Sequence, residues 1–533
     1  MPFLLMVFLV LLSLPEPRDW TEPLWLTDSP WDCILATGLT VLLTTLYACR
    51  ITRRFSRSID AAPALRERFL QRYERDRFRH LIAVYVSYLV SLFGLGWGWA
   101  IAQLWVGQTG TLPGAELLIL SPFVAAQVMA WAVFYDAERA VHRAAQRLLA
   151  AESQTGGWLE LERTRASGPP VFGSRMAYVL FQLRQKLALA FLPALLLLML
   201  KDLQRLFPAA WQEWQKSINF LGIGAVLLVF IALPWIIRLI LGLKPLPAGP
   251  LRSRLEAAAR RLRFRYSNIL LWNTRSGMAN AMVVGILPWV RYVVFTDRLL
   301  EDFSPEETEA VFGHEVGHVR HHHMLYYFSF LTASVIVLFC LINEVCAYFH
   351  LTEWLDPRYH QSGWFSSAAL VIVLLAYIFM VFGFLSRRCE RQADVFGCRA
   401  VSCPNPHCEG HDRDIVLPPR GQGLCPTGVD TFIRALEKVA FVNGISRDRP
   451  GFLQSWQHST IGRRVEFLRR MRNNPGVERN FQRRTAWVKW SLLLVLCGTI
   501  GVLLFRESSE ISRLPNDDEP ARPSLSKDIE LRP

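Results

Sequence analysis

Charged residues are nearly absent from eight long stretches of this 533-residue sequence. A soluble helix seldom needs about twenty consecutive apolar residues, whereas a helix that crosses a bilayer does. The missing charge therefore argues against a soluble protein with buried helices and predicts a mainly α-helical, multispan membrane protein. The predicted spans cover roughly residues 32–50, 80–104, 115–135, 185–203, 218–243, 326–348, 364–385 and 488–505.

The amino terminus lacks the features of a cleaved signal peptide. Residues 1–14 are apolar, but they have no basic n-region and no obvious small-residue cleavage site. They are also too short to span a bilayer comfortably. Three alternatives stay open for them: a short anchor, a signal-like segment or an interfacial helix.

A disulfide framework and internal repeats are missing as well. The ten cysteines are scattered, and several lie inside predicted spans. The densest group, from Cys389 to Cys425, falls on the side of the membrane that is predicted below to be cytosolic, where thiols stay reduced. We therefore expect no disulfide framework.

The formal charge of +14 comes largely from segments that flank the predicted spans. Basic residues gather in 51–79, 136–184 and 251–265, whereas 104–114 has no charge. Basic loops mark the cytoplasmic side of a membrane protein. One orientation satisfies every loop, and it also places 386–487 inside. The charge is therefore interpreted as an orientation signal and a lipid-headgroup contact, and nucleic acid is not expected as a partner.

A strong helix start precedes the most informative motif. Ser304 is a typical N-cap, Pro305 suits the first helical position, and Glu307 completes a capping box. The helix is expected to run to about Met324. Upstream, 256–264 predicts a basic helix, and the β-branched and aromatic sequence MVVGILPWVRYVVFT predicts one or two short strands.

Residues 314–318 read His-Glu-Val-Gly-His. Positions i and i+4 share one face of a helix, so both imidazoles can reach one Zn²⁺ while Glu315 lies beside a metal-bound water. Zinc lowers the pKa of such a water, and the carboxylate can take its proton as the water attacks a peptide carbonyl. The motif predicts His314 and His318 as metal ligands and Glu315 as the general base.

A third ligand must come from elsewhere in the chain. The extended pattern with a third histidine fails because Met324 occupies that position. The adjacent run His321–His323 is expected to face headgroups or solvent. Glu390 is the better candidate, and Asp394, one turn later, can accept a hydrogen bond from a ligand imidazole. Both motifs fall on the same membrane face, at the two ends of the hairpin 326–385.

These motifs resemble the family of membrane zinc endopeptidases that includes the CAAX prenyl proteases and the HtpX heat-shock proteases. Residues 386–394 fit its S-R-x-x-E-x-x-A-D pattern at every fixed position, and 294–300 match its lead-in to the zinc helix. The resemblance covers roughly 250–475. It implies a gluzincin-type catalytic domain with one zinc per chain, ligated by His314, His318 and Glu390.

Two further segments carry the resemblance less completely. Asn280, Ala281 and Met282 resemble the family's N-A-F segment, with methionine in place of phenylalanine. The resemblance implies that this segment lines the substrate cleft as an edge strand. His458 and Arg464 resemble an H-P-P-x-x-x-R segment without its two prolines. The resemblance implies that His458 stabilises the oxyanion and that Arg464 orients a ligand.

The function expected from these features is hydrolysis of internal peptide bonds in a peptide or membrane-protein substrate, on the cytosolic side. Whether the substrate is a prenylated peptide, a misfolded membrane protein or a regulator stays open. The alternatives are a catalytically silent metal-binding scaffold and a transporter-like protein. A transporter would show prominent intramembrane acidic residues, and few are visible.

One departure from the resemblance is an insertion rich in cysteine and proline. The sequence favours a surface loop with incidental cysteines, because the spacing is not that of a familiar zinc finger. The alternative is a second, structural zinc site formed by Cys403, Cys408 and Cys425, with His407 and His411 as further candidates.

The predicted organisation divides near residue 244, where KPLPAGP ends the last N-terminal span. Its parts are a hydrophobic segment with a short outer loop (1–31), a membrane domain of about five spans (32–243), a metalloprotease domain (244–480) with a two-span hairpin (326–385) and the insertion (402–426), a C-terminal span (488–505) and a disordered tail (506–533).

Overall fold

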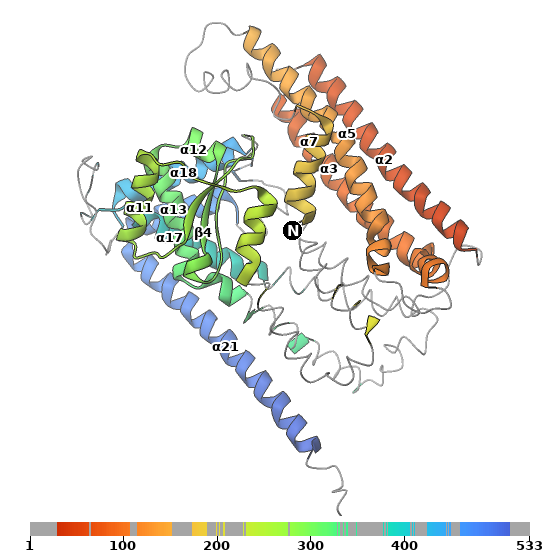
Figure 1. Cartoon of the computed structure of the whole chain (residues 1–533). Helices are drawn as coiled ribbons and strands as arrows, with labels where there is room; N and C mark the ends of the chain where they lie inside the picture. The colour runs from red at the N-terminus through yellow and green to blue at the C-terminus, as the bar shows by residue number, and fades with distance from the viewer. Residues whose placement is uncertain are drawn as a thin grey trace, which may run out of the picture.

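The computed structural model is mainly helical, with candidate membrane spans and one small sheet, which confirms the predicted fold class. A bundle of long helices lies beside a domain that contains the sheet, and one long helix extends from that domain (Figure 1). The structure describes residues 29–62, 66–106, 114–151, 173–188, 231–275, 278–327, 382–403, 424–443 and 459–511, and isolated residues between these ranges.

The N-terminal bundle is built from helices that are longer than the predicted spans. The basic segment 51–79, predicted as a loop, is helical up to Ala61 and again from Arg66. One of its arginines contacts an aromatic ring of the same helix: the Arg77 guanidinium lies over the Tyr73 ring, 5.5 Å from the ring centroid. The segment 136–184 likewise begins as helix. The main helices are α2 (Pro30–Ala61), α3 (Arg66–Leu89), α5 (Ala115–Ala151) and α7 (Arg175–Gln182).

Three described helices are long and apolar enough to cross a membrane. A fourth results if two helices that meet at an angle of 59° form one broken span, and the break contains Gly96 in the left-handed conformation, with φ 69°. The predicted spans 185–203, 326–348 and 364–385, and 218–230 of another, lie largely outside the described residues. The helices are Pro30–Ala61, Leu117–Val141 and Gly476–Val502, with Arg72–Gly94 and Trp97–Leu104 as the bent pair.

The second domain contains a four-stranded sheet of order β1-β2-β4-β3. β2 and β4 are parallel, and the two outer strands are antiparallel to their neighbours. Two of the strands fall in the predicted segment, whereas β1 and β2 were not predicted. β3 lies at an edge of this sheet. The strands are β1 (Lys244–Pro245), β2 (Asn268–Trp272), β3 (Ala281–Val284) and β4 (Tyr292–Thr296).

Helices cover the sheet and form the rest of the domain (Figure 1). The predicted basic helix is present but runs from Pro250 to Arg261. The long last helix continues to Ile511, past the predicted end of the C-terminal span. The helices are α11 (Pro250–Arg261), α12 (Asp297–Asp302), α13 (Pro305–Arg320), α17 (Gly383–Ala400), α18 (Pro426–Val442), α20 (Ile461–Asn473) and α21 (Pro475–Ile511).

Helix α13 begins as predicted and ends earlier than predicted. The Ser304 side chain accepts a hydrogen bond from the Glu307 backbone N–H, and the Glu307 carboxylate accepts one from the Ser304 N–H, which is the complete capping box. The helix ends at Arg320, because His322 takes the left-handed conformation with φ 54°. Helix resumes at His323, so the chain changes direction four residues before the predicted end.

Candidate metal centre

Helices α13 and α17 pack closely because glycine faces the contact. A Cβ added at Gly317 would lie 2.9 Å from Phe396 Cβ and 3.1 Å from Ala393 Cα. Both distances are shorter than an ordinary carbon–carbon contact of about 3.5–4.0 Å. The glycine of the His-Glu-Val-Gly-His motif therefore lets α17 approach the helix that carries both histidines.

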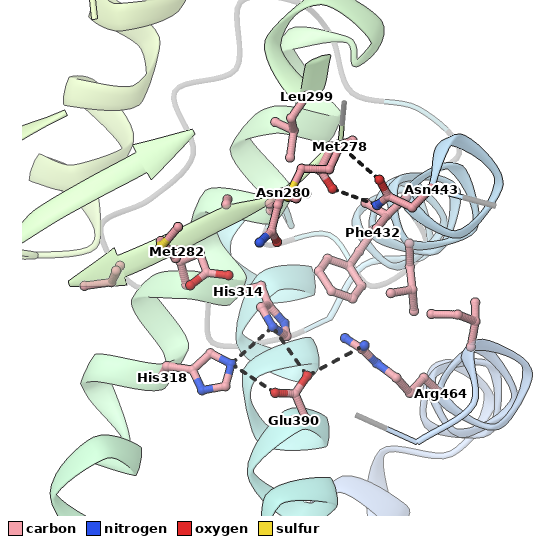
Figure 2. A pocket seen from close by; sticks show the side chains of 18 of the residues that line it. Met278, Asn280, Met282, Leu299, His314, His318, Glu390, Phe432, Asn443 and Arg464 are labelled. Carbon is pink, nitrogen blue, oxygen red and sulfur yellow. Dashed lines mark hydrogen bonds and ion pairs between the residues drawn. The ribbon is translucent and has the colours of Figure 1, made fainter. Parts of the chain in front are cut away.

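This packing brings three potential ligand atoms together (Figure 2). His314 Nε2 lies 3.2 Å from His318 Nε2. Glu390 lies 3.9 Å from the first of these nitrogens and 3.6 Å from the second. Ligands about 2.0–2.1 Å from a tetrahedral zinc ion would lie roughly 3.3 Å apart. Two histidines and one glutamate are the ligand set of a catalytic zinc site with an open position.

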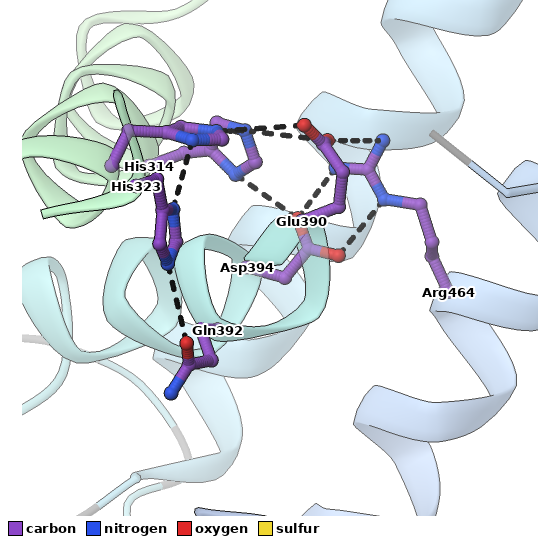
Figure 3. Close-up of polar contacts among 7 residues, drawn as sticks. His314, His323, Glu390, Gln392, Asp394 and Arg464 are labelled. Atoms are coloured by element: carbon purple, nitrogen blue, oxygen red, sulfur yellow. Dashed lines mark hydrogen bonds and ion pairs between the residues drawn. The ribbon is translucent and has the colours of Figure 1, made fainter. Parts of the chain in front are cut away.

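Asp394 and Arg464 fix the orientation of His314. Asp394 Oδ1 lies 3.0 Å from His314 Nδ1, and Arg464 Nε donates to Asp394 Oδ2 at 2.8 Å (Figure 3). Burial alone would raise the pKa of Asp394, but the guanidinium and the imidazole hold it below its ordinary value. Burial alone would lower the pKa of His314, but Asp394 and the nearby carboxylates raise it. An ionised Asp394 favours the tautomer with the proton on Nδ1, so Nε2 presents its lone pair to the centre.

A second chain of contacts fixes His318. His323 Nδ1 lies 3.0 Å from His318 Nδ1, and His323 Nε2 lies 3.2 Å from Gln392 Oε1 (Figure 3). The Gln392 amide nitrogen donates to Gln482 Oε1 on α21 at 2.7 Å. Because Gln392 Oε1 can only accept, His323 carries its proton on Nε2 and accepts at Nδ1 from His318. Burial and the neighbouring His318 lower the pKa of His323 to about 2, which is consistent with a neutral ring.

The two tautomers provide a test of whether this site suits a cation. Both Nε2 atoms are acceptors, since each ring has its proton on Nδ1, yet they lie 3.2 Å apart. Two lone pairs at this distance repel each other unless a positive ion lies between them. The buried Glu390 carboxylate adds negative charge to the same point. The donor set therefore fits a divalent metal ion.

The prediction for the run His321–His323 was wrong for its last member. His323 is fully buried, whereas His322 is exposed and His321 is half-buried. The left-handed backbone at His322 turns His323 away from the surface and towards His318. The sequence signal for this role is weak, because a histidine five residues after His318 lies on the other side of a continuous helix.

A cavity of about 730 Å³ adjoins the three candidate ligands. Glu315 lines it from α13, and Asn280, Ala281 and Met282 line it from the edge of the sheet (Figure 2). Its wall also contains apolar side chains from several elements, among them Met278, Leu299, Val311, Phe432, Leu436 and Val439.

Asn443, just after α18, holds the strand that borders the cavity. Its amide nitrogen donates to the Ala279 carbonyl at 2.8 Å, and its carbonyl accepts from the Ala279 N–H at 2.9 Å. This pair of hydrogen bonds fixes the backbone just before β3. No local pattern in the sequence marks Asn443, since only the fold brings it to the strand.

The structure thus brings together eight of the predicted site residues around one cavity, with Asp394 behind them. His458 lies outside the described residues. Arg464 is buried against Asp394, with its Nη1 3.7 Å from Glu390 Oε2. The eight are Asn280, Ala281, Met282, His314, Glu315, His318, Glu390 and Arg464.

Residues 245–409 match the model of peptidase family M48. The chain is 26% identical over 162 residues to a CAAX prenyl protease 1 homolog of Arabidopsis thaliana, which covers 29% of this chain and 38% of the relative. It is 30% identical over 167 residues to the homolog of Dictyostelium discoideum, covering 28% and 36%. It is 29% identical over 181 residues to a protease HtpX homolog of Archaeoglobus fulgidus, covering 33% and 49%.

These alignments span between about a third and a half of the length of the curated relatives. The crystal structure of Ste24p from S. mikatae aligns with a TM-score of 0.44 and 16% identity, over 82% of this chain and 98% of that one. The matched segment contains both histidines, Glu315 and Glu390. This segment of the chain is therefore similar to peptidase family M48.

Proposed function

We propose that this protein is an integral-membrane zinc endopeptidase whose metal is held by His314, His318 and Glu390. The observation that carries the proposal is the convergence of two imidazole nitrogens and one carboxylate, 3.2–3.9 Å apart, beside a cavity that Glu315 lines. The match of residues 245–409 to the model of a peptidase family supports the reaction class. Helices apolar enough to cross a membrane support the location.

A zinc ion at this centre would supply Lewis-acid polarisation of the scissile carbonyl and would lower the pKa of a water molecule. Glu315 takes the proton of the attacking water and delivers it to the leaving amine. Asp394 and His323 hold the two imidazoles in the tautomer that ligation requires. His458 stays a predicted oxyanion stabiliser.

The edge strand β3 is the proposed platform for the substrate. Within the described sheet, β3 pairs with β4 on one side only. An extended peptide can add to such an edge through main-chain hydrogen bonds, with alternate side chains entering neighbouring pockets. The apolar side chains of the cavity then contact the substrate on either side of the cleaved bond. We expect the substrate to bind as an extended, unfolded segment.

The basic flanking segments favour a cytosolic position for the centre, with the bilayer and a peptide or membrane-protein substrate as partners. Some relatives are named prenyl proteases. A lipidated peptide is thus one substrate class to include in an assay, beside unfolded membrane proteins.

The test is Glu315→Gln in the full chain, purified in detergent and assayed on an unfolded protein and on quenched fluorescent peptides. The zinc content should stay at about one ion at this centre, because the ligands are intact, while cleavage should fall by about 10²–10⁴-fold. Glu466→Gln, an exposed glutamate on α20, is the matched control and should keep its activity. Normal cleavage by the Glu315 variant would refute the mechanism.

Replacing Glu390 by alanine tests the ligand set. Loss of the carboxylate should lower zinc binding at this centre, measured by metal analysis after dialysis against a weak chelator. An unchanged metal content would remove Glu390 from the site. A wild-type protein that binds zinc yet cleaves no substrate, with and without added zinc, would instead support the scaffold alternative.

A further inference from the structure

Three cysteines far from the His314 centre meet where the insertion leaves α17 and enters α18. Cys403 follows the end of α17, and Cys425 is the N-cap of α18. Their Sγ atoms and that of Cys408 all lie within 4.8 Å of one another. Each of the three residues is at most 5% exposed, and together they form a buried cluster of their own. The prediction of a surface loop with incidental cysteines is therefore wrong for these thiols.

Hydrogen-bonding groups contact two of the three sulfur atoms. The Gly428 backbone N–H donates to Cys425 Sγ at 3.2 Å, at the first turn of α18. Thr427 Oγ1 lies 3.2 Å from Cys408 Sγ. Backbone N–H groups and the positive end of a 17-residue helix stabilise negative charge on sulfur. Three thiolates gathered in one buried place, however, repel each other unless a cation joins them.

The backbone around the cluster is already fixed by polar contacts. Ser402 Oγ donates to the Cys398 carbonyl at 2.8 Å and accepts from the Cys425 N–H at 3.2 Å. A Cβ added at Gly428 would lie 3.0 Å from Ser402 Cα. The two ends of the insertion are thus held side by side, which presents the three sulfurs together. A disulfide would use two of them and leave the third buried and unpaired.

We propose that Cys403, Cys408 and Cys425 hold a second, structural zinc ion, distinct from the ion at His314. Thiolates are the preferred ligands of structural zinc, and sulfur atoms about 2.3 Å from a tetrahedral ion lie roughly 3.8 Å apart. Structural sites are usually closed by a fourth protein ligand. The sequence of the same insertion offers His407 and His411, which lie outside the described residues.

The position of the cluster indicates what the ion would do. α17 carries Glu390 and Asp394, and α18 carries Phe432, whose ring stacks on the His314 ring at a centroid distance of 5.8 Å. The ion joins the end of α17 to the beginning of α18. It would therefore hold together two helices that border the catalytic cavity, without contacting a substrate.

The test is metal content of the full chain, purified in detergent under reducing conditions. We expect about two zinc ions per chain in the wild type and about one in Cys425→Ser. The double variant His314→Ala/His318→Ala should also keep about one. Cys497→Ser, an exposed cysteine outside the cluster, is the matched control and should keep two. Loss of the second ion in His407→Ala or His411→Ala would identify the fourth ligand.

Cobalt gives a readout that is independent of peptidase activity. In the His314→Ala/His318→Ala protein, bound Co²⁺ should show thiolate-to-metal charge-transfer absorption, and adding Cys425→Ser should abolish it. Retention of one ion in Cys425→Ser shows that this variant is folded. If Cys425→Ser loses both ions because it does not fold, the cobalt spectrum of the His314→Ala/His318→Ala protein tests the site instead. Charge-transfer absorption there supports the proposal. A histidine variant without bound metal, or with two of the three thiols oxidised to a disulfide, would overturn the proposal while leaving the proposed peptidase function untouched.

Discussion

Replacing Gly317 by alanine should weaken the metal centre without touching any ligand. The new Cβ would lie 2.9 Å from Phe396 Cβ and 3.1 Å from Ala393 Cα. Both atoms are fixed to the α17 backbone, so no side-chain rotation relieves the contact. Reaching an ordinary separation of about 3.5–4.0 Å requires the two helices to move apart by roughly 0.5–1 Å.

The magnitude follows from two opposing effects. Overpacking costs about 1–3 kcal/mol, whereas alanine in place of glycine inside a helix returns up to about 1 kcal/mol. The fold should thus lose about 0–2 kcal/mol. Metal–ligand distances tolerate only about 0.2 Å, and Glu390 lies one turn before Ala393 on the helix that moves. If about 1.4 kcal/mol of the strain is relieved by withdrawing Glu390, zinc affinity falls about tenfold.

The assay is zinc titration in competition with a chromophoric chelator, with the melting temperature measured on the same samples. Gly38→Ala in α2 is the control, because a Cβ there meets nothing within 4 Å. The reasoning is refuted if Gly317→Ala binds zinc as tightly as the wild type. A variant that melts earlier but keeps its zinc affinity would show that the strain is absorbed elsewhere.

Three further predictions concern the groups around the ligands. Arg464→Met leaves the buried Asp394 without its guanidinium partner and should cost up to about 3–5 kcal/mol in urea unfolding, whereas the same change at the exposed neighbour Arg463 should not; equal effects of the two variants would contradict the pairing of Arg464 with Asp394. His323→Ala should lower zinc affinity about 10–100-fold by freeing the His318 ring, with the exposed His322→Ala as its control. Because carboxylates raise the pKa of His314, a proton should compete with zinc as the pH falls through that raised value. The apparent zinc affinity, measured by competition with a chelator, should then begin to fall above pH ~6.5, the ordinary value for histidine; an affinity that stays constant down to well below that pH would contradict the contact.

The start of α13 could be predicted from the sequence because the interactions that define it are local. The capping box uses residues three positions apart, and the i, i+4 spacing alone places both histidines on one face. The end of α13 could not be predicted in the same way. It depends on the left-handed backbone at His322, which is stabilised by burial of His323 against α17, and that contact is invisible in a local window.

Non-local pairing also explains the other differences. β2 is a five-residue strand whose partner β4 is parallel and lies beyond another strand, so neither length nor periodicity signals it. The arrival of Glu390 at the histidines was predicted from the resemblance and the expected hairpin, and not from its own neighbours. For Cys403, Cys408 and Cys425, spacing was misleading because 16 residues separate the last two, and only packing at the helix ends brings them together.

The contacts of the metal centre link it to a helix that can cross the membrane. The chain of contacts from His318 passes through His323 and Gln392 to Gln482 on α21, the helix that contains the candidate span Gly476–Val502. His314 is instead fixed by Asp394 and Arg464, which belong to α17 and α20. One ligand is therefore oriented through α17 and α20, and the other through α17 and α21, a helix long and apolar enough to cross a membrane. A shift of α21 along its axis would lengthen the contact at Gln482 and loosen His318 before His314, so the position of this helix bears directly on the geometry of the centre.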